Sequence, residues 1–391
     1  MLGAKAHGAP TIMARMKIGI IVPYSWSFWG GVVEHAELQA HALQGLGHEV
    51  KTIMGNDPPG QFTRVLHPRH GRHGQPPPDV IPIGRSVIVP ANGSLPNIIL
   101  SPRSVLRIKK ALEREQFDVV HLHEPMTPTP CIATLAWCTA PMVATFHANG
   151  ELGWMKLGKF GWGFLADRLD HRIAVSERAL ESARRWLPGE YEVVPNGVLI
   201  PPHADPSNRE HRVVFAGRHE NRKGLHVLLQ AWPEIRRRTG ATLSICGADP
   251  LRVRLLMTRL RIADDGIEVR GFLPQEEFTA ELLRSKALIA PSLGGESFGI
   301  VLTRALACAT PVAASDIDGY RDVVNPDVGV AFPPGDVAAL TAAVEGLLAN
   351  EDRRERMGVA GRRLAQERYS WEAIARRLTE IYESILVRAA A

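Results

Sequence analysis

The chain has 391 residues, of which 45% are hydrophobic and 22% charged, so it can bury a large core and is long enough for two domains. It contains no run of about 18 or more apolar residues, and residues 1–15 lack the apolar centre of a secretory signal. These features argue against an integral membrane or secreted protein. We expect a cytoplasmic protein whose residues 1–15 form a disordered extension. The net charge of +5 suits an anionic ligand or membrane surface.

Short apolar runs rich in β-branched residues recur along the chain, with helical periodicity between them. In the first half they cover residues 17–23, 48–54, 118–123, 141–147, 172–176 and 191–195. In the second half they cover residues 212–218, 242–247, 267–272, 287–292, 310–315 and 328–332. Buried runs of this length that alternate with helices are typical of parallel strands joined by crossover helices. The sequence therefore predicts an α/β protein with two consecutive doubly wound domains.

The two series of strands are separated by a segment rich in proline and polar residues, Asn196 to Arg212, which predicts an interdomain linker. We place the first domain at residues 16–203 and the second at residues 204–370. Residues 371–391 form an amphipathic helix that needs a surface to pack against. Its apolar residues are Trp371, Ile374, Leu378, Ile381 and Leu386.

Ligands of open parallel sheets bind at the carboxyl ends of the strands, so the natural site is the cleft between the domains. The first strand is followed by Gly30 and Gly31 and then by a helix, an arrangement in which backbone N–H groups can approach a diphosphate. A plain tight turn would give the same pattern. The strand at 212–218 is followed by "RHENRKG", in which Arg218 and Lys223 could neutralise phosphate oxygens, although a solvated loop is an equal alternative.

The stretch "SLGGESFGIVLTRALACATPV", residues 292–312, places a lone carboxylate, Glu296, between a glycine turn and a mostly apolar helix. A carboxylate there could accept hydrogen bonds from sugar hydroxyls, or simply complement the helix dipole. In the first domain, His121, His123 and Glu124 follow one strand and His147 follows the next. A lone histidine is more often structural, but its place at a strand's carboxyl end favours a role in the cleft, and His147 is our candidate.

Taken in order, these segments resemble the retaining glycosyltransferases of family 4, and within them the phosphatidylinositol mannosyltransferases. The matching segments are "VPYSWSFWGGV", "HLHEP", "VATFH", "RIAVS", "PNGV", "GRHENRKG" and "LGGESFGIVL". The resemblance implies the GT-B fold, with two Rossmann-like domains that face each other across a cleft. The first domain would bind the acceptor and the second the nucleotide sugar, and the C-terminal helix would cross back to the first domain.

The resemblance also implies an activity. The expected reaction moves a hexose, with mannose from GDP-mannose favoured, to a phosphatidylinositol-like lipid or polyol, with retained anomeric configuration. No metal or other cofactor and no nucleic acid are expected, and the protein would act at the inner face of the membrane. The alternatives are a relative that uses a UDP-sugar for cell-envelope glycan or glycolipid synthesis, and a non-catalytic protein that binds sugar nucleotides.

Residue roles carry over to matching positions. By resemblance, His147 would contact the transferred sugar, Arg218 and Lys223 would hold the diphosphate, and Glu296 would bind sugar hydroxyls. The further donor-binding positions are Gly30, Gly31, Gly295, Phe298, Gly299, Ile300 and Arg304. The acceptor-binding candidates are Tyr24, Asn92 and Ser94, and the candidates for membrane contact are Arg107, Lys109 and Lys110.

The sequence departs from the family at three positions. Arg304 stands where the family has a second Glu that grips the nucleotide ribose. A guanidinium cannot accept hydrogen bonds from hydroxyls, so Arg304 must donate to them, pair with phosphate, or find an internal carboxylate. Ala91 replaces an aromatic residue of the acceptor loop, and Asn97 replaces a basic residue just after that loop.

Overall fold

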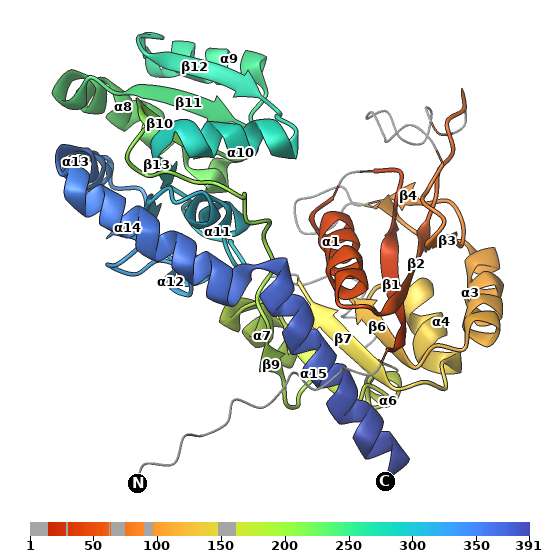
Figure 1. Ribbon diagram of the computed structural model, residues 1–391. Coiled ribbons are helices and arrows are strands. Elements are labelled where there is room, and N and C mark those ends of the chain that lie inside the picture. The colour runs from red at the N-terminus through yellow and green to blue at the C-terminus, as the bar shows by residue number, and fades with distance from the viewer. Residues whose placement is uncertain (1–14, 29, 62, 64–74, 90–96, 148–161) are drawn as a thin grey trace, which may run out of the picture.

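All twelve predicted strands are present in the computed structural model, and they form two separate sheets (Figure 1). The structure describes residues 15–28, 30–61, 63, 75–89, 97–147 and 162–391. The extension predicted for residues 1–15 therefore lies almost wholly outside the described residues. No helix among the described residues is both long and apolar enough to cross a membrane.

The first sheet has the strand order β3-β2-β1-β6-β7-β8-β9, and all neighbours on this path are parallel. A short antiparallel pair, β4 and β5, joins it where Tyr24 pairs with Ile98. The sequence analysis missed β3, β4 and β5, each of two or three residues, although it predicted the equally short β9. The strands are β1 (Lys17–Ser25), β2 (Glu49–Gly55), β3 (Val80–Pro82), β4 (Val87–Ile88), β5 (Asn97–Ile98), β6 (Val119–His123), β7 (Met142–Phe146), β8 (His171–Ala174) and β9 (Glu192–Val193). The helices are α1 (Gly31–Gly45), α3 (Pro102–Glu115), α4 (Pro130–Trp137), α6 (Trp162–Ala166) and α7 (Glu177–Arg184).

The second sheet has the order β12-β11-β10-β13-β14-β15 and is parallel throughout. Its first strand begins at Glu210, inside the segment predicted as linker, because its first residues pair with β13 at Ser285. The strands are β10 (Glu210–Ala216), β11 (Thr242–Cys246), β12 (Ile267–Gly271), β13 (Ser285–Ala290), β14 (Val312–Ser315) and β15 (Gly329–Phe332). The helices are η1 (Asn221–Lys223), α8 (Leu225–Thr239), α9 (Pro250–Leu260), α10 (Gln275–Arg284), α11 (Ile300–Ala307), α12 (Asp318–Arg321), α13 (Val337–Ala349), α14 (Glu351–Leu364), η2 (Ala365–Tyr369) and α15 (Trp371–Ala390).

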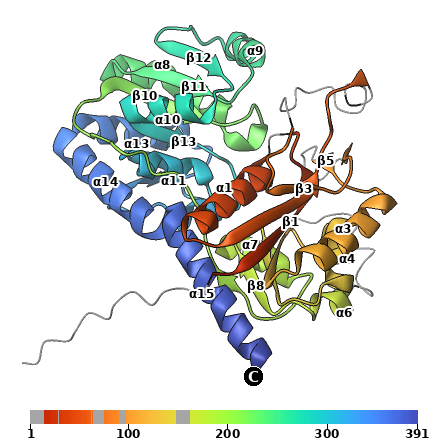
Figure 2. The same ribbon diagram turned by 45° about the vertical axis from the view of Figure 1, so that its right-hand side comes forward.

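Helices cover both faces of each sheet, which explains why the central strands are apolar at successive positions. In β10, Val213 and Phe215 pack with α8, α9 and α13, whereas Val214 packs with α10 and α11 on the other face. In β1, Ile20 packs with α1 and α15, whereas Ile21 packs with α3 and α4. Figure 2 shows the two layered domains side by side.

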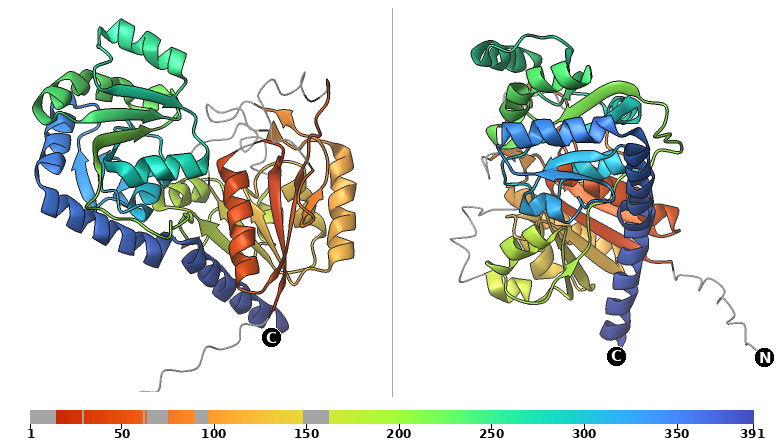
Figure 3. Two further views of the ribbon diagram at one scale, coloured as in Figure 1. Left: turned by 45° about the horizontal axis from the view of Figure 1, so that its top comes forward. Right: turned by 90° about the vertical axis from the view of Figure 1, so that its left-hand side faces the viewer.

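The C-terminal helix α15 leaves the second domain and packs on α1 of the first, as predicted (Figure 3). Trp371, Ile374, Leu378 and Ile381 are all buried in this contact, and Leu386 is partly buried. The chain passes between the domains twice, once in the linker and once just before α15. The two segments lie side by side, and the N–H of Val198 donates to the carbonyl of Tyr369 at 2.7 Å. The structure thus has the predicted doubly wound domains and the returning helix.

Candidate functional site

Loops that follow β10, β11, β12 and β13 converge on one pocket of about 330 Å³ in the second domain. Its cations are Arg218, Arg222, Lys223 and Arg304. Its apolar wall comprises Phe272, Leu273, Phe278, Ile300 and Val301, and Gly217 and Gly247 lie at the strand ends. The pocket therefore offers positive charge beside an apolar surface, the combination that a diphosphate joined to a flat base requires.

Glu296 lies at the edge of this pocket and is held by two cations. Its carboxylate is 2.6 Å from Nη1 of Arg222 and 2.9 Å from Nζ of Lys223, and its side chain is 10% exposed. Arg218 does not reach Glu296 but pairs with Glu220 at 2.9 Å. Glu220 also pairs with Arg222, at 2.8 Å. Each of the three Lys and Arg side chains in the "RHENRKG" loop therefore contacts at least one of the two carboxylates.

Backbone contacts fix the two loops against each other. The N–H of Leu293 donates to the carbonyl of Arg222 at 2.7 Å, and a Cβ at Gly224 would lie 1.8 Å from the carbonyl oxygen of Pro291. Gly224 also has a φ of +67°, so only glycine fits this crossing. This close approach places Arg222 and Lys223 beside Glu296.

The mostly apolar helix that follows Glu296 begins four residues after it. Helix α11 starts at Ile300 with Gly299 as its N-cap, and no side chain caps it. Gly299 has a φ of +77°, and a Cβ there would lie 2.8 Å from the Tyr320 ring. Phe298 is buried in the core against Tyr369, so only its backbone can face the pocket.

A second pocket, of about 310 Å³, lies on the other side of Glu296 and is lined by residues of both domains. Gly294, Gly295 and Glu296 form one wall, and Arg178 of α7 contributes from the first domain. The acidic pair on the remaining wall, Asp316 and Asp318, is bound by Arg321 at 2.6 and 2.9 Å. Asp316 directly follows β14 and Asp318 begins α12, and both carboxylates already have Arg321 as a partner.

Arg304 pairs with a carboxylate of the first domain. Its Nη2 is 2.5 Å from Oε1 of Glu34, in the first turn of α1, and both side chains are 29% exposed. Of the three partners considered for Arg304, the structure provides the internal carboxylate.

Gly30 and Gly31 stand at the start of α1. Both are exposed, and a Cβ at either position would meet no described atom within 4 Å. Packing within the described chain therefore does not require glycine here. An open, glycine-lined helix start is the arrangement that lets a ligand approach the backbone.

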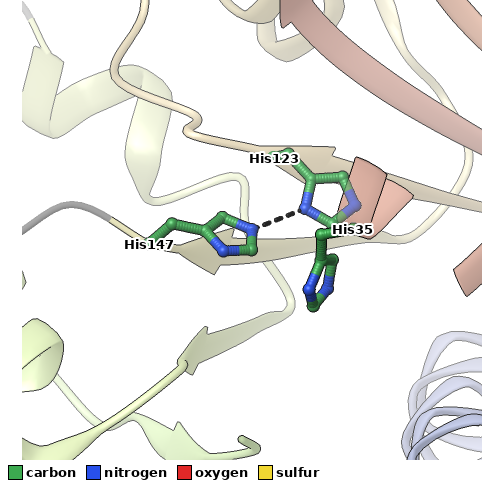
Figure 4. Close-up of side chains that lie close together, drawn as sticks. All are labelled: His35, His123 and His147. Atoms are coloured by element: carbon green, nitrogen blue, oxygen red, sulfur yellow. Dashed lines mark hydrogen bonds between the residues drawn. The ribbon is translucent and has the colours of Figure 1, made fainter. Parts of the chain in front are cut away.

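In the first domain, three histidines meet at the carboxyl ends of β6 and β7 (Figure 4). Nε2 of His147 lies 2.8 Å from Nδ1 of His123, and the His35 ring makes an edge contact with the His147 ring at 4.7 Å between centroids. The backbone N–H of His147 donates to the side-chain carboxylate of Glu124 at 3.0 Å. Glu124 has a φ of +51°, which places it in the sparsely populated left-handed region.

This cluster is connected to the C-terminal helix. The ring of His123 stacks on that of His121 at 4.9 Å, and Nδ1 of His121 is 2.6 Å from the Tyr382 hydroxyl of α15. Nε2 of His121 is 2.7 Å from the hydroxyl of Thr145. The returning helix α15 therefore contacts His121, whose ring stacks on His123, and His123 in turn is hydrogen-bonded to His147.

Burial keeps these imidazoles neutral near pH 7. Burial lowers the pKa of His35 to about 4 and that of His121 to about 3. It also lowers the pKa of His123 and His147 well below the ordinary value, and the neighbouring imidazoles act in the same direction. With both rings neutral, one nitrogen of the His123–His147 contact donates and the other accepts.

The same three histidines are a set of described residues that could hold a metal. Their possible ligand nitrogens lie within 4.8 Å of one another, and neutral imidazoles are ligands for zinc. The 2.8 Å contact already uses Nδ1 of His123 and Nε2 of His147, so these two nitrogens could bind a metal only if that hydrogen bond were broken. Metal independence stays a prediction.

The acceptor candidates are only partly within the described residues. Tyr24 lies at the end of β1, where burial and the nearby Glu124 raise the pKa of its hydroxyl. Asn92 and Ser94, like Ala91, lie outside the described residues, while Asn97 begins β5.

The membrane candidates lie on α3, whose apolar face is not available to lipid. Ile108 is buried, and Val105 and Leu112 pack against the same core. The basic residues Arg107, Lys109 and Lys110 are exposed, and Nη1 of Arg107 donates to the carbonyl of Ile83 at 3.4 Å. Beside them, Leu106 is 62% exposed and Trp137, over which Lys109 lies at 5.9 Å, is 40% exposed. Any membrane contact by α3 would thus use its charged outer face and these few apolar residues.

The sequence analysis did not assign Arg222, Glu34, His35 or His123 to the site. Arg222 is adjacent to Lys223 in the sequence, but the sequence alone does not show that both side chains contact Glu296. His35 sits among apolar residues on the inner face of α1. Its partners come from β6 and β7, so its helical position alone gave no signal.

Two doubly wound domains, one with a histidine cluster and the other with a cation-lined pocket, have the architecture of the GT-B fold. Solved structures agree on the fold. The sucrose-phosphate synthase of Thermosynechococcus elongatus superposes with a TM-score of 0.73 at 19% identity, covering 96% of this chain and 100% of that one. HepE of Anabaena in complex with UDP superposes with a TM-score of 0.68 at 17% identity, covering 94% and 100%.

The chain belongs to glycosyltransferase family 4. The family profile "Glycosyltransferase Family 4" matches residues 29–199, and "Glycosyl transferases group 1" matches residues 201–364. The phosphatidyl-myo-inositol mannosyltransferase of Mycobacterium leprae is 34% identical, covering 95% of this chain and 97% of the relative. The glycogen synthase of Mycobacterium tuberculosis is 27% identical, covering 93% and 94%. The resemblance read from the sequence is confirmed.

Proposed function

We propose that the protein transfers mannose from GDP-mannose to phosphatidylinositol or a related inositol lipid, with retention of the anomeric configuration and without a metal. The observation that carries the proposal is the 34% identity, over 95% of the chain, to phosphatidyl-myo-inositol mannosyltransferases. The cation-lined pocket supports a diphosphate donor, and the basic face of α3 supports an anionic lipid surface.

In this proposal, the donor diphosphate lies among Arg218, Arg222 and Lys223, and its charge competes with Glu220 and Glu296 for these cations. The sugar lies between Glu296 and His147. The acceptor hydroxyl attacks the anomeric carbon from the side on which the diphosphate leaves. The new C–O bond forms as the bond to the phosphate oxygen breaks, and the acceptor proton passes to that oxygen. Stabilisation of the departing diphosphate by the three cations would supply several kcal/mol.

The membrane side of the proposal needs no spanning helix. Each exposed cation near an anionic lipid surface contributes about 1 kcal/mol of binding free energy, so Arg107, Lys109 and Lys110 would together hold the protein at the inner face of the membrane. Docking there would bring an acceptor lipid to the first domain.

The test is to follow nucleoside diphosphate release from GDP-mannose, UDP-glucose and UDP-N-acetylglucosamine, with phosphatidylinositol vesicles and with phosphatidylcholine vesicles. We expect release only from GDP-mannose with phosphatidylinositol, and a mannosylated lipid by mass spectrometry. Turnover of a UDP-sugar without lipid would overturn the proposed donor and acceptor. Release from no donor, together with thermal stabilisation by a nucleotide, would favour the non-catalytic alternative.

A further inference from the structure

Arg304 differs from the other cations of the donor pocket in the origin of its partner. Arg218, Arg222 and Lys223 all pair with Glu220 or Glu296, which belong to the same domain. Arg304 pairs with Glu34, which lies 270 residues away in the sequence and in the other domain. Arg304 therefore links the pocket to the opposite wall of the cleft.

Glu34 is part of the helix start that carries the glycine pair. Its N–H donates to the carbonyl of Gly30 at 2.9 Å, and Gly30 is the N-cap of α1 with no side chain to cap it. The Glu34 carboxylate thus lies at the positive end of the helix dipole and is also in contact with the Arg304 guanidinium. Within the described part of the chain, Arg304 is the partner recorded for this carboxylate.

The Glu34–Arg304 ion pair lies between the donor pocket and the start of α1. Arg304 lines the pocket with Arg218, Arg222 and Lys223, while Glu34 lies only three residues beyond Gly31. Both side chains are 29% exposed, so water screens the pair less than it would at an open surface. The ion pair thus connects the start of α1 in the first domain with the cation-lined pocket of the second domain.

We propose that Glu34 and Arg304 form a positioning pair that holds Gly30 and Gly31, at the start of α1, next to the donor pocket. Arg304 takes this role at the position where the family has a residue that binds the nucleotide. This inference rests on the proposed donor site. Arg304 cannot accept a hydrogen bond from a ribose hydroxyl, and Nη2 of its guanidinium is 2.5 Å from Oε1 of Glu34. Glutamate at position 304 would place two carboxylates side by side across the cleft, and the domains would separate there.

The decisive experiment exchanges the two charges. The variants R304E and E34R and the double variant E34R/R304E are compared with the wild type in kcat/KM for GDP-mannose. We expect each single variant to lose about tenfold or more, because like charges then face each other across the cleft. The double variant, in which the opposite charges are restored with exchanged positions, should recover to within about threefold of the wild type. Losses that multiply in the double variant would overturn the proposal, because Arg304 would then act by contact with the donor.

A second measurement does not depend on turnover. Spin labels at E113C on α3 and R237C on α8, both exposed in the wild type and far from the pair in sequence, report the distance between the domains. The four native cysteines are buried and should not react. We expect a broader distance distribution in R304E and in E34R, and the wild-type distribution in the double variant. Unchanged distributions in both single variants would overturn the pair's positioning role, even if the enzyme used another donor.

Discussion

The two walls of the cleft contain polar groups in opposite states. The first domain presents neutral imidazoles, with His35, His121 and His123 buried and linked by ring contacts and hydrogen bonds. The second domain presents charged groups: Arg222 and Lys223 form ion pairs with Glu296, and their side chains are 38% and 16% exposed. A neutral wall avoids the cost of burying charge but is vulnerable to acid. A charged wall can exchange its internal partners for a diphosphate. The following predictions test this contrast.

The largest effect is expected at Glu296. Replacing it with alanine leaves Arg222 and Lys223 without their carboxylate and removes the proposed contact to sugar hydroxyls. We expect kcat to fall by about 10²–10³-fold. Nucleoside diphosphate release measures the loss, and circular dichroism checks the fold. The matched control is E345A, which removes an exposed carboxylate paired with Arg238 and should leave the rate unchanged. A wild-type rate in E296A would contradict the assigned role.

The next effect tests the neutral wall. H147A should lower kcat by about 100-fold if the ring contacts the sugar at the reacting centre. H123A should lower it less, because His123 orients His147 through the 2.8 Å hydrogen bond. The double variant should be no worse than H147A, since His123 acts only through His147. Losses that multiply in the double variant would show an independent role for His123.

Acid should weaken the fold through the same residues. The pKa of His35 is about 4 and that of His121 about 3 in the folded protein, against about 6.5 when unfolded. Below pH 6.5 the unfolded chain takes up protons that the folded chain refuses, so stability is lost as the pH falls through this window. Each such imidazole should cost about 1.4 kcal/mol per pH unit.

Urea unfolding at pH 7.5 and pH 5.5 measures this loss. H121Q removes one of the buried imidazoles and should reduce this pH dependence. Equal free energies of unfolding at both pH values in the wild type would contradict the buried neutral state.

A smaller effect is expected at the outer face of α3. Alanine at Arg107, Lys109 or Lys110 should each weaken binding to vesicles containing phosphatidylinositol by about fivefold, which corresponds to about 1 kcal/mol. Vesicle sedimentation measures the binding. R363A removes a side chain that is 79% exposed on α14 of the second domain and should have no effect. Equal binding by the triple variant and the wild type would remove α3 from the membrane proposal.

The smallest effect is expected from metal removal. Treatment with EDTA followed by desalting should leave kcat unchanged, because the proposed chemistry uses Arg218, Arg222 and Lys223 to stabilise the diphosphate. The measurement is nucleoside diphosphate release before and after treatment. A loss of activity that zinc restores would instead identify His35, His123 and His147 as a metal site.

Much of the fold could be predicted because burial leaves a local pattern. Apolar runs of five to seven residues marked every long strand, and the register of Trp371, Ile374 and Leu378 indicated a helix that needed a partner surface. The short strands β3, β4 and β5 were missed, whereas the two residues of β9 lie within a longer apolar run, 191–195, and were found. The positions of Glu296, His147 and the "RHENRKG" loop could also be read, because carboxyl ends of parallel strands gather at one edge of a sheet.

The sequence alone determined that this protein has two doubly wound domains, a returning helix, and catalytic candidates at the strand ends. Only the tertiary structure decided which charges meet: Arg222 with Glu296, and Arg304 with Glu34 across the cleft. It also showed that the apolar face of α3 is buried against the core of the first domain. The physical reason is that helical and strand periodicities are written locally in the chain. The partner of a charge depends on how two domains pack, which no local pattern records.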